Sequence, residues 1–286
     1  MFGSIEFGGT KIRCAVFDEE GNLKDQIRIN TSKPDINMKE IENFYKDKKI
    51  YSLGVGAFGP IDINEKSISY GIIQNTPKKD WISFNLLENL KEIIDTNIGI
   101  VTDVGLSAIG EYNEGAGKDF HSMLYLTIGT GIGGAYIQQG KLLNGLSHPE
   151  MGHIEVVREL DDKANSVCIY HDNCLEGLAS GPSIKERKGI EATDLDINDQ
   201  VFDITSKYIA KALYTYSLIL RPNVIILGGG LMNKDGFIEK VRNEFDIIKG
   251  NYIDLPNSEL YIVKPELGDD SALVGGYYLA KQLITE

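Results

Sequence analysis

The chain has 286 residues, of which 42% are hydrophobic and 25% are charged, and its formal net charge is −13. A chain of this size buries a large core and is expected to form two lobes of a soluble protein, while its acidic balance excludes nucleic acid and anionic membranes as expected partners. No apolar run reaches membrane-spanning length, no signal peptide is recognisable and only three cysteines occur, so we expect a cytoplasmic protein.

The first part of the chain alternates predicted strands with predicted helices. A glycine turn, Gly8-Gly9-Thr10, separates the first two strands, and Asp103 directly follows the last strand of this part. The expected strands are Met1–Phe7, Ile12–Phe17, Leu23–Ile29, Ile50–Gly56 and Ile98–Thr102, and the expected helices are Lys39–Asp47, Leu86–Asp95 and Leu106–Glu114.

The same order of elements then begins again, with a strand at Ser122–Ile128, a glycine turn at Gly129–Gly134 and a returning strand at Ala135–Gln138. This repeat suggests an internal duplication, and the alternation of helices and strands indicates an α/β protein. We expect an N-terminal lobe at 1–116, a C-terminal lobe at 117–270, and a closing helix in 271–286 that packs back on the N-terminal lobe. The remaining expected elements are the helices Ser183–Arg187, Asp203–Leu220 and Ala272–Ile284 and the strands Val224–Leu227 and Leu260–Lys264.

A segment of the second part carries two histidines and two cysteines, which together make a complete tetrahedral zinc set: His153, Cys168, His171 and Cys174. Because all four ligand positions are filled by protein, a structural zinc is favoured over a catalytic one. Two alternatives stand beside zinc. The cysteines can be small buried hydrophobic residues, or Cys168 and Cys174 can form a disulfide that leaves Cys14 unpaired.

The two glycine turns are candidates for phosphate binding. Glycine lets backbone N–H groups converge, and Thr10 and Thr130 add hydroxyl donors beside Gly9 and Gly131. Each turn alone is more often a plain hairpin, and it is the pair of turns together with a third glycine run that favours phosphate binding. A dinucleotide-binding fingerprint is disfavoured because a strand, not a helix, follows Gly134. A third run, Gly228-Gly229-Gly230 at a strand end, lets a flat ligand such as an adenosine approach the backbone.

Asp103 is the candidate general base. A carboxylate at the carboxyl end of a strand opens into the region where α/β proteins place ligands, and phosphoryl transfer needs a base beside the attacking hydroxyl. The alternative reading is an N-cap of the helix that begins near Leu106, and one residue can serve both purposes.

Taken together, these motifs resemble the ROK family of sugar kinases over nearly the whole chain. The stretches that carry the likeness are Glu6–Lys11, Gly129–Gly134, Glu150–His153, Cys174–Pro182 and Gly228–Leu231. Thr76–Trp81 and the Cys168, His171, Cys174 spacing are most similar to the zinc-containing fructokinase branch of that family.

The resemblance implies a two-lobed actin-like ATPase (ribonuclease H-like) fold with a zinc-binding insertion, and transfer of the γ-phosphoryl of ATP to a hexose, most readily D-fructose to fructose 6-phosphate. It implies Mg²⁺, a structural Zn²⁺ and a homodimer. It places Asp103 as the base, and the residues Gly59, Glu150, His153 and Glu176 at the sugar. The implied nucleotide-binding residues are Gly9, Thr10, Lys11, Thr130, Gly131, Pro182, Gly228, Gly229 and Gly230.

Two departures from the family pattern bear on the function. Glu6 stands where the family usually has Asp, and Gly105 stands where Asn usually follows the base. These departures leave open glucokinase, mannokinase or another hexose kinase activity, or a non-catalytic sugar-sensing protein. A sugar-responsive repressor is disfavoured, because only seven residues precede Gly8 and such proteins carry a helix-turn-helix domain there.

Overall fold

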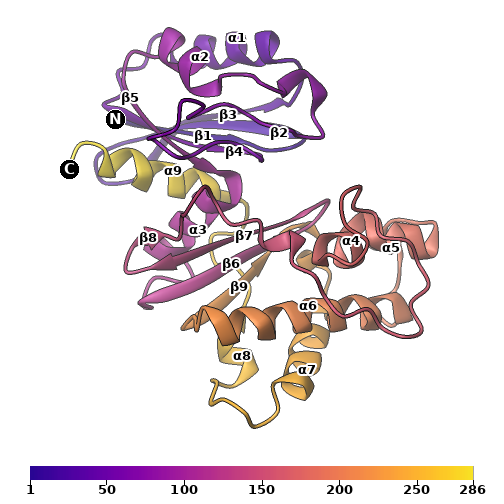
Figure 1. The fold of residues 1–286 in the computed structure, drawn as a ribbon. Coiled ribbons are helices and arrows are strands. Elements are labelled where there is room, and N and C mark those ends of the chain that lie inside the picture. The colour runs from indigo at the N-terminus through magenta and orange to yellow at the C-terminus, as the bar shows by residue number, and fades with distance from the viewer. Residues whose placement is uncertain (286) are drawn as a thin grey trace. The chain divides into compact units, whose positions relative to one another are not determined.

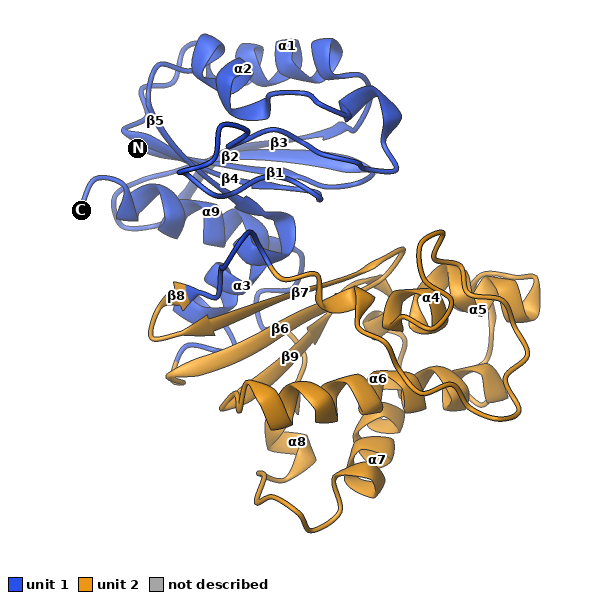
Figure 2. Cartoon of the chain, viewed as in Figure 1, with its two compact units in different colours: residues 1–118, 142–148, 266–286 blue, residues 119–141, 149–265 orange. Residues whose placement is uncertain are grey.

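The computed structural model describes residues 1–285, which form two compact units (Figure 2). Unit 1 comprises residues 1–118, 142–148 and those from 266 onward, and unit 2 comprises residues 119–141 and 149–265. Within the described residues, no helix combines the length and the apolar character needed to cross a membrane.

The sheet of unit 1 has the strand order β3-β2-β1-β4-β5. The first three strands pair antiparallel, and β4 and β5 continue the sheet in parallel from β1. Helices α1 and α2 cover one face and α3 and α9 the other (Figure 1). The bounds are β1 Phe2–Phe7, β2 Lys11–Phe17, β3 Leu23–Asn30, β4 Ser52–Ala57, β5 Asn97–Thr102, α1 Pro34–Tyr45, α2 Leu86–Ile93, α3 Asp103–Glu114 and α9 Ser271–Gln282.

The sheet of unit 2 repeats this arrangement, with the order β10-β9-β6-β7-β8. Strands β6 and β7 pair antiparallel, whereas β9 lies parallel to both β6 and β10. The two sheets therefore share one topology, as the repeated element order in the sequence suggests. The bounds are β6 Ser122–Ile128, β7 Ile132–Gln138, β8 Lys141–Leu142, β9 Val224–Gly228, β10 Ile262–Val263, α4 Leu175–Ala179, α5 Gly181–Lys188, α6 Gln200–Ile219, α7 Phe237–Lys249 and α8 Ser258–Tyr261.

Strand β1 shows how the period of two separates the two faces of the unit 1 sheet. Ile5 and Phe7 are fully buried in the cluster that includes the apolar residues of α1 and α2. Phe2 belongs to a separate buried cluster with Leu273 and Tyr277 of α9. Glu6, which follows Ile5, therefore lies on the α9 face of the sheet.

Helices α3 and α9 approach each other closely because both carry glycine at the contact. A Cβ on Gly110 would lie 2.0 Å from the carbonyl oxygen of Ser271, and one on Gly275 would lie 1.8 Å from that of Leu106. Any larger side chain at either position would push the helices apart.

Two sequence predictions are wrong in detail, and one helix was not predicted. The helix expected from Lys39 begins at Pro34, because proline is pre-organised for the first helical turn. The strand expected at Leu260–Lys264 begins only at Ile262, because a short helix, α8, precedes it. Asn257 caps this helix, and the Asn257 side chain accepts the N–H of Glu259. Helix α7 was not expected, although Phe237, Ile238, Val241 and Phe245 give it one buried face.

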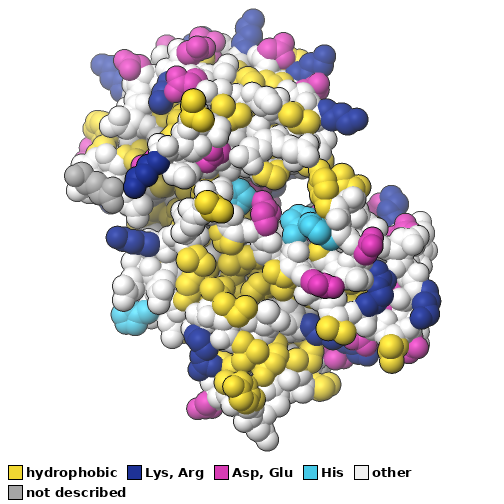
Figure 3. Space-filling view, viewed as in Figure 1, with side chains coloured by type: hydrophobic (Ala, Val, Ile, Leu, Met, Phe, Trp, Pro, Cys, Tyr) yellow, Lys and Arg dark blue, Asp and Glu magenta, His cyan; other side chains and the backbone are white. Residues whose placement is uncertain are grey.

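Acidic and basic side chains are interspersed on the face of the molecule shown in Figure 3, where dark blue Lys and Arg lie among magenta Asp and Glu. That face offers no extended basic surface for a polyanion, in keeping with the formal net charge of −13.

Candidate active site

The first glycine turn lies between β1 and β2 of unit 1. The N–H of Gly8 donates to the Lys11 carbonyl oxygen at 2.9 Å, which closes the turn, and the Thr31 hydroxyl donates to the Gly8 carbonyl oxygen at 2.8 Å. Gly9 and Thr10 are exposed at its tip, and Lys11 begins β2 half-buried. The turn is thus a fixed hairpin whose tip is open to a ligand.

Glu6, at the end of β1, lies opposite Arg13 on β2. Its Oε2 is 4.0 Å from the Arg13 guanidinium, and that oxygen is buried without a hydrogen-bond partner among the described residues. Burial raises the pKa of Glu6, while Arg13 opposes the rise. Arg13 itself is held by the Asp270 carboxylate at 2.5 Å. A buried carboxylate oxygen that lacks a partner among the described residues and lies next to this glycine turn fits a water bound to Mg²⁺.

Asp103 is the first residue of α3, and its Oδ1 accepts the N–H of Val104 at 2.8 Å. The prediction that Asp103 caps this helix is wrong, since the N-cap is Thr102, whose Oγ1 accepts the Gly105 N–H at 3.0 Å. Capping by Thr102 relieves Asp103 of that role. The Asp103 carboxylate is half-buried and directly follows the carboxyl end of β5.

Gly59 follows β4 in a loop with a cis Gly59-Pro60 peptide bond. The imidazole of His148 lies beside it, with Cε1 3.7 Å from the position that a Cβ on Gly59 would occupy. His148 was not predicted as a site residue. His148 is the first residue of the stretch His148–His153, and its closeness in sequence to the predicted site residues Glu150 and His153 could have indicated it.

The second glycine turn joins β6 to β7 in unit 2. The N–H of Gly129 donates to the Gly131 carbonyl oxygen at 2.9 Å, and the Gly129 carbonyl oxygen accepts from Gly181 N–H at 2.8 Å. This last bond brings the start of α5 against the turn. A strand, β7, follows the turn as expected, which confirms that it is not a dinucleotide-binding fingerprint.

A cavity of about 1000 Å³ unites the three expected nucleotide motifs of unit 2. Thr130 of the turn, Pro182 of α5 and Gly230 after β9 all line it. Gly229 has a φ of +90°, and a Cβ there would lie 2.5 Å from the backbone of Ile128, so only glycine fits. Gly228 ends β9 and is buried. The volume is large enough for an adenosine.

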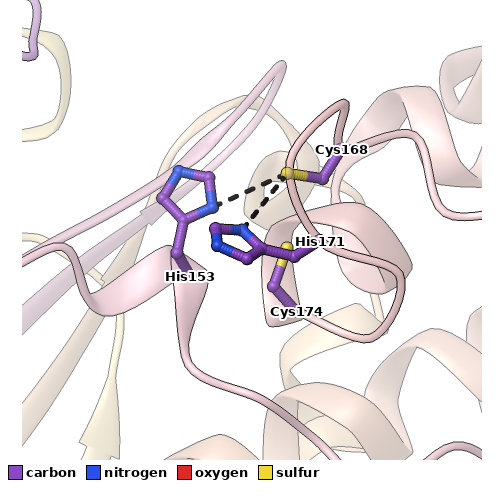
Figure 4. A group of neighbouring side chains, drawn as sticks. All are labelled: His153, Cys168, His171 and Cys174. Carbon is purple, nitrogen blue, oxygen red and sulfur yellow. Dashed lines mark hydrogen bonds between the residues drawn. The ribbon is translucent and has the colours of Figure 1, made fainter.

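The predicted metal ligands come together in one cluster (Figure 4). The ligand atoms of His153, Cys168, His171 and Cys174 all lie within 4.8 Å of one another. Cys168 Sγ is 3.8 Å from His153 Nδ1 and 3.6 Å from His171 Nδ1. Both cysteines are free thiols, so the disulfide alternative is not present. Two sulfurs and two imidazole nitrogens at these separations fit a tetrahedral Zn²⁺.

Cys174 is placed by the helix that follows it. Its Sγ accepts the N–H of Gly177 at 3.3 Å as the N-cap of α4. Burial raises the pKa of the Cys174 thiol to about 11. A bound cation favours the thiolate form of such a thiol, and Zn²⁺ would supply that charge.

The two carboxylates that flank the metal ligands have different environments. Glu176 Oε2 accepts the N–H of Ile132 at 2.9 Å, and its Oε1 lies 3.9 Å from His153 Nε2. Glu150 is exposed, and its carbonyl oxygen accepts from His153 N–H at 3.0 Å. Unit 2 therefore joins Glu150, His153 and Glu176 to the second glycine turn, while Gly59 and Asp103 belong to unit 1.

Comparison with known proteins gives one consistent result. A family model described as ROK family matches residues 2–283. The chain is 42% identical over 288 residues to a fructokinase of Lactococcus lactis subsp. cremoris, covering 100% of this chain and 98% of the relative. It is 38% identical over 281 residues to a fructokinase of Pediococcus pentosaceus, covering 98% of each.

A solved structure shares the fold over almost the whole chain. This is a ROK family glucokinase from Streptomyces griseus in complex with glucose and AMPPNP, with a TM-score of 0.79 at 23% identity over 98% of this chain and 99% of that chain. The expected α/β fold of the actin-like ATPase class is thereby confirmed. From its first strand to its last helix, the chain belongs to the ROK family.

Proposed function

We propose that the protein is an ATP-dependent hexose kinase that converts D-fructose to fructose 6-phosphate. The observation that carries this proposal is the identity of 42% to a fructokinase over 100% of the chain. The glucokinase, mannokinase and other hexose kinase readings share the reaction and differ in the sugar.

The nucleotide is assigned to the two glycine turns and the cavity of unit 2. The solved glucokinase of similar fold holds AMPPNP, an ATP analogue, which supports ATP as the donor. The cavity accepts the adenosine beside Pro182 and Gly230, which Gly229 precedes in the chain. The backbone donors of Gly131 and Gly9 hold phosphate oxygens. Thr10, Lys11 and Thr130 add side-chain donors to the same phosphates.

The sugar is assigned to Glu150, His153 and Glu176, with Gly59 leaving room beside it. Carboxylates and an imidazole are suited to orienting vicinal hydroxyls through hydrogen bonds, so that positioning supplies much of the acceleration. Zn²⁺ held by His153, Cys168, His171 and Cys174 keeps this segment in one conformation when bound.

The reaction needs one base and a means of offsetting phosphate charge. The Asp103 carboxylate accepts the proton of the fructose 6-hydroxyl while that oxygen bonds to the γ-phosphorus, and the bond from the γ-phosphorus to the β–γ bridging oxygen breaks to release ADP. Glu6 is the residue that would hold Mg²⁺, and the ion, when bound, would offset the charge on the phosphates.

The family likeness also supports a cytoplasmic homodimer whose partners are the sugar and ATP, with neither nucleic acid nor membrane bound. Sedimentation of the purified protein at two concentrations tests the dimer, which a monomer at both concentrations would contradict.

A coupled assay of ADP release with fructose, glucose and mannose under identical conditions tests the activity. We expect the largest kcat/KM with fructose. A preference for glucose or mannose would change the sugar assigned to the protein and leave the proposed phosphoryl transfer unchanged. Binding of fructose by calorimetry without ADP release from any of the sugars would identify a non-catalytic sugar-binding protein.

A further inference from the structure

Glu111 is a buried carboxylate that the proposed reaction does not use. It lies on α3, eight residues after Asp103, which is about 12 Å along the helix axis. Its side chain is fully buried, yet each of its oxygens accepts two hydrogen bonds. The donors are Ala116 N–H at 2.9 Å and Glu266 N–H at 3.0 Å on Oε2, and Leu267 N–H at 2.9 Å and the Ser271 hydroxyl at 2.6 Å on Oε1.

These donors belong to two stretches of chain that are far apart in sequence. The chain leaves unit 1 after Lys118, and Ala116 lies in the stretch that leads there. The chain passes through unit 1 again at 142–148 and returns to it for the last time at Glu266, so Glu266 and Leu267 are the first residues after that last return. One side chain therefore fastens both of these connections to α3.

The sequence around Glu111 is adapted to this contact. A Cβ on Gly115 would lie 2.1 Å from Glu111 Oε2, so only glycine leaves the carboxylate in place. The Glu111 carbonyl oxygen also accepts the N–H of Gly117 at 2.9 Å, which holds the leaving stretch a second time. A fully satisfied buried carboxylate is costly to disturb, because the three backbone N–H donors would then be left unpaired.

We propose that Glu111 is a positioning residue, which fixes the two connections to the helix that carries Asp103 so that the units move about a constant pivot when substrates bind. The proposal rests on the proposed kinase function, in which closure around substrates precedes transfer. Because Glu111 keeps the two connections at a fixed position relative to Asp103, closure brings the phosphate to Asp103 in a single geometry.

The Glu111→Gln variant tests this, because an amide nitrogen replaces one acceptor and faces the backbone donors. We expect kcat with fructose to fall roughly tenfold or more with the KM for fructose nearly unchanged, since misplacement penalises the transfer step. The compaction on adding fructose and AMPPNP, measured by small-angle X-ray scattering, should also diminish. Ser271→Ala is the matched control: it removes one donor, leaves the three backbone bonds, and should lose stability without losing kcat or compaction.

A folded Glu111→Gln variant with the kcat and compaction of Ser271→Ala would overturn the proposal. Hydrogen exchange on the wild-type protein decides the case even if the variant does not fold. The amides of Ala116, Glu266 and Leu267 should stay protected with and without ligands, and loss of their protection on binding would also overturn the pivot. Absence of wild-type activity with any sugar would instead count against the proposed function, and the exchange result would remain informative.

Discussion

The His153 ring and the Glu176 carboxylate form a link between the metal cluster and the second glycine turn. His153 Nδ1 faces Cys168 Sγ at 3.8 Å, while its Nε2 lies 3.9 Å from Glu176 Oε1. Glu176 Oε2 in turn accepts the N–H of Ile132, directly after the turn residue Gly131. A carboxylate that accepts a hydrogen bond from a metal-binding histidine fixes the orientation of the ring, and Glu176 lies just outside that distance from His153. Here the same carboxylate also fixes the turn assigned to phosphate.

Replacing Glu176 with Ala should therefore weaken the binding of both substrates. The change leaves Ile132 N–H without its acceptor and His153 without its neighbour, and we expect each affinity to fall by about tenfold. Calorimetry with fructose and with AMPPNP measures the two separately. Glu155→Ala, an exposed neighbour, is the control. An unchanged affinity for AMPPNP in Glu176→Ala would show that the link does not reach the turn.

Removal of one cluster thiol should release the metal. Freshly purified protein is expected to hold about one zinc ion per chain, and Cys168→Ala should lose it and melt at a lower temperature, because the other ligands then hold the segment without a cation. Elemental analysis and thermal unfolding measure the two effects. Cys14→Ala, which removes a buried cysteine of β2 outside the cluster, should keep its zinc. Wild-type protein that contains no zinc would refute the assignment.

Substitution of Asp103 by Asn should abolish most of the turnover while preserving the shape of the site. A general base contributes about 10² to 10⁴-fold, so kcat should fall by that order, with fructose affinity changed only a few-fold. Steady-state assay and calorimetry give both numbers. Asp95→Asn, at an exposed position, is the charge-matched control. Near-normal turnover in Asp103→Asn would remove Asp103 from the mechanism.

The residues that local pattern could predict are those whose partners are close in sequence or share a motif. Strand β6 has the bounds that its apolar pattern indicates, and the four metal ligands follow from ligand type and spacing. The start of α3 was misplaced by three residues, since Thr102 and Asp103 are both good caps and only the structure shows that Thr102 accepts from Gly105.

The contacts that could not be predicted depend on residues brought together by the tertiary fold. Glu111 reads as an ordinary residue of an amphipathic helix, because three of its donors lie 155 to 160 residues further along the chain. The bond from Ile132 to Glu176 spans 44 residues and involves a backbone N–H, which carries no signature in sequence. Only the folded structure reveals such hydrogen bonds.

Glu6→Gln should separate stability from catalysis. The Glu6 side chain is half-buried, and its Oε2 is buried without a hydrogen-bond partner among the described residues. Burial raises the pKa of Glu6, so its charge destabilises the folded state. Arg13 retains Asp270 after the change. We therefore expect an equal or higher melting temperature, together with a higher Mg²⁺ concentration for half-maximal activity at fixed ATP. An unchanged Mg²⁺ requirement would exclude Glu6 from holding the ion.

Asp162 should stabilise the insertion, which is the segment 153–174 that carries the expected metal ligands, and this stabilisation should be lost at acid pH. Burial alone would raise its pKa, but Arg187, which bonds both of its oxygens at 3.2 and 2.7 Å, and the Tyr208 hydroxyl at 2.7 Å lower the pKa from 3.8 to about 2. A lowered folded pKa stabilises the protein above pH 3.8, by about 2 kcal/mol, and this contribution is lost as pH falls toward 2.

The difference in free energy of unfolding between wild type and Asp162→Asn measures that contribution. It should be constant above about pH 5 and shrink between about pH 4 and pH 2, because only the wild type then takes up a proton against the Arg187 charge. The exposed Asp161→Asn variant should show no such trend relative to wild type. A difference that stays constant down to pH 2 would mean that the Asp162–Arg187 pair does not control the folded pKa, and that the two side chains hold the insertion by packing instead.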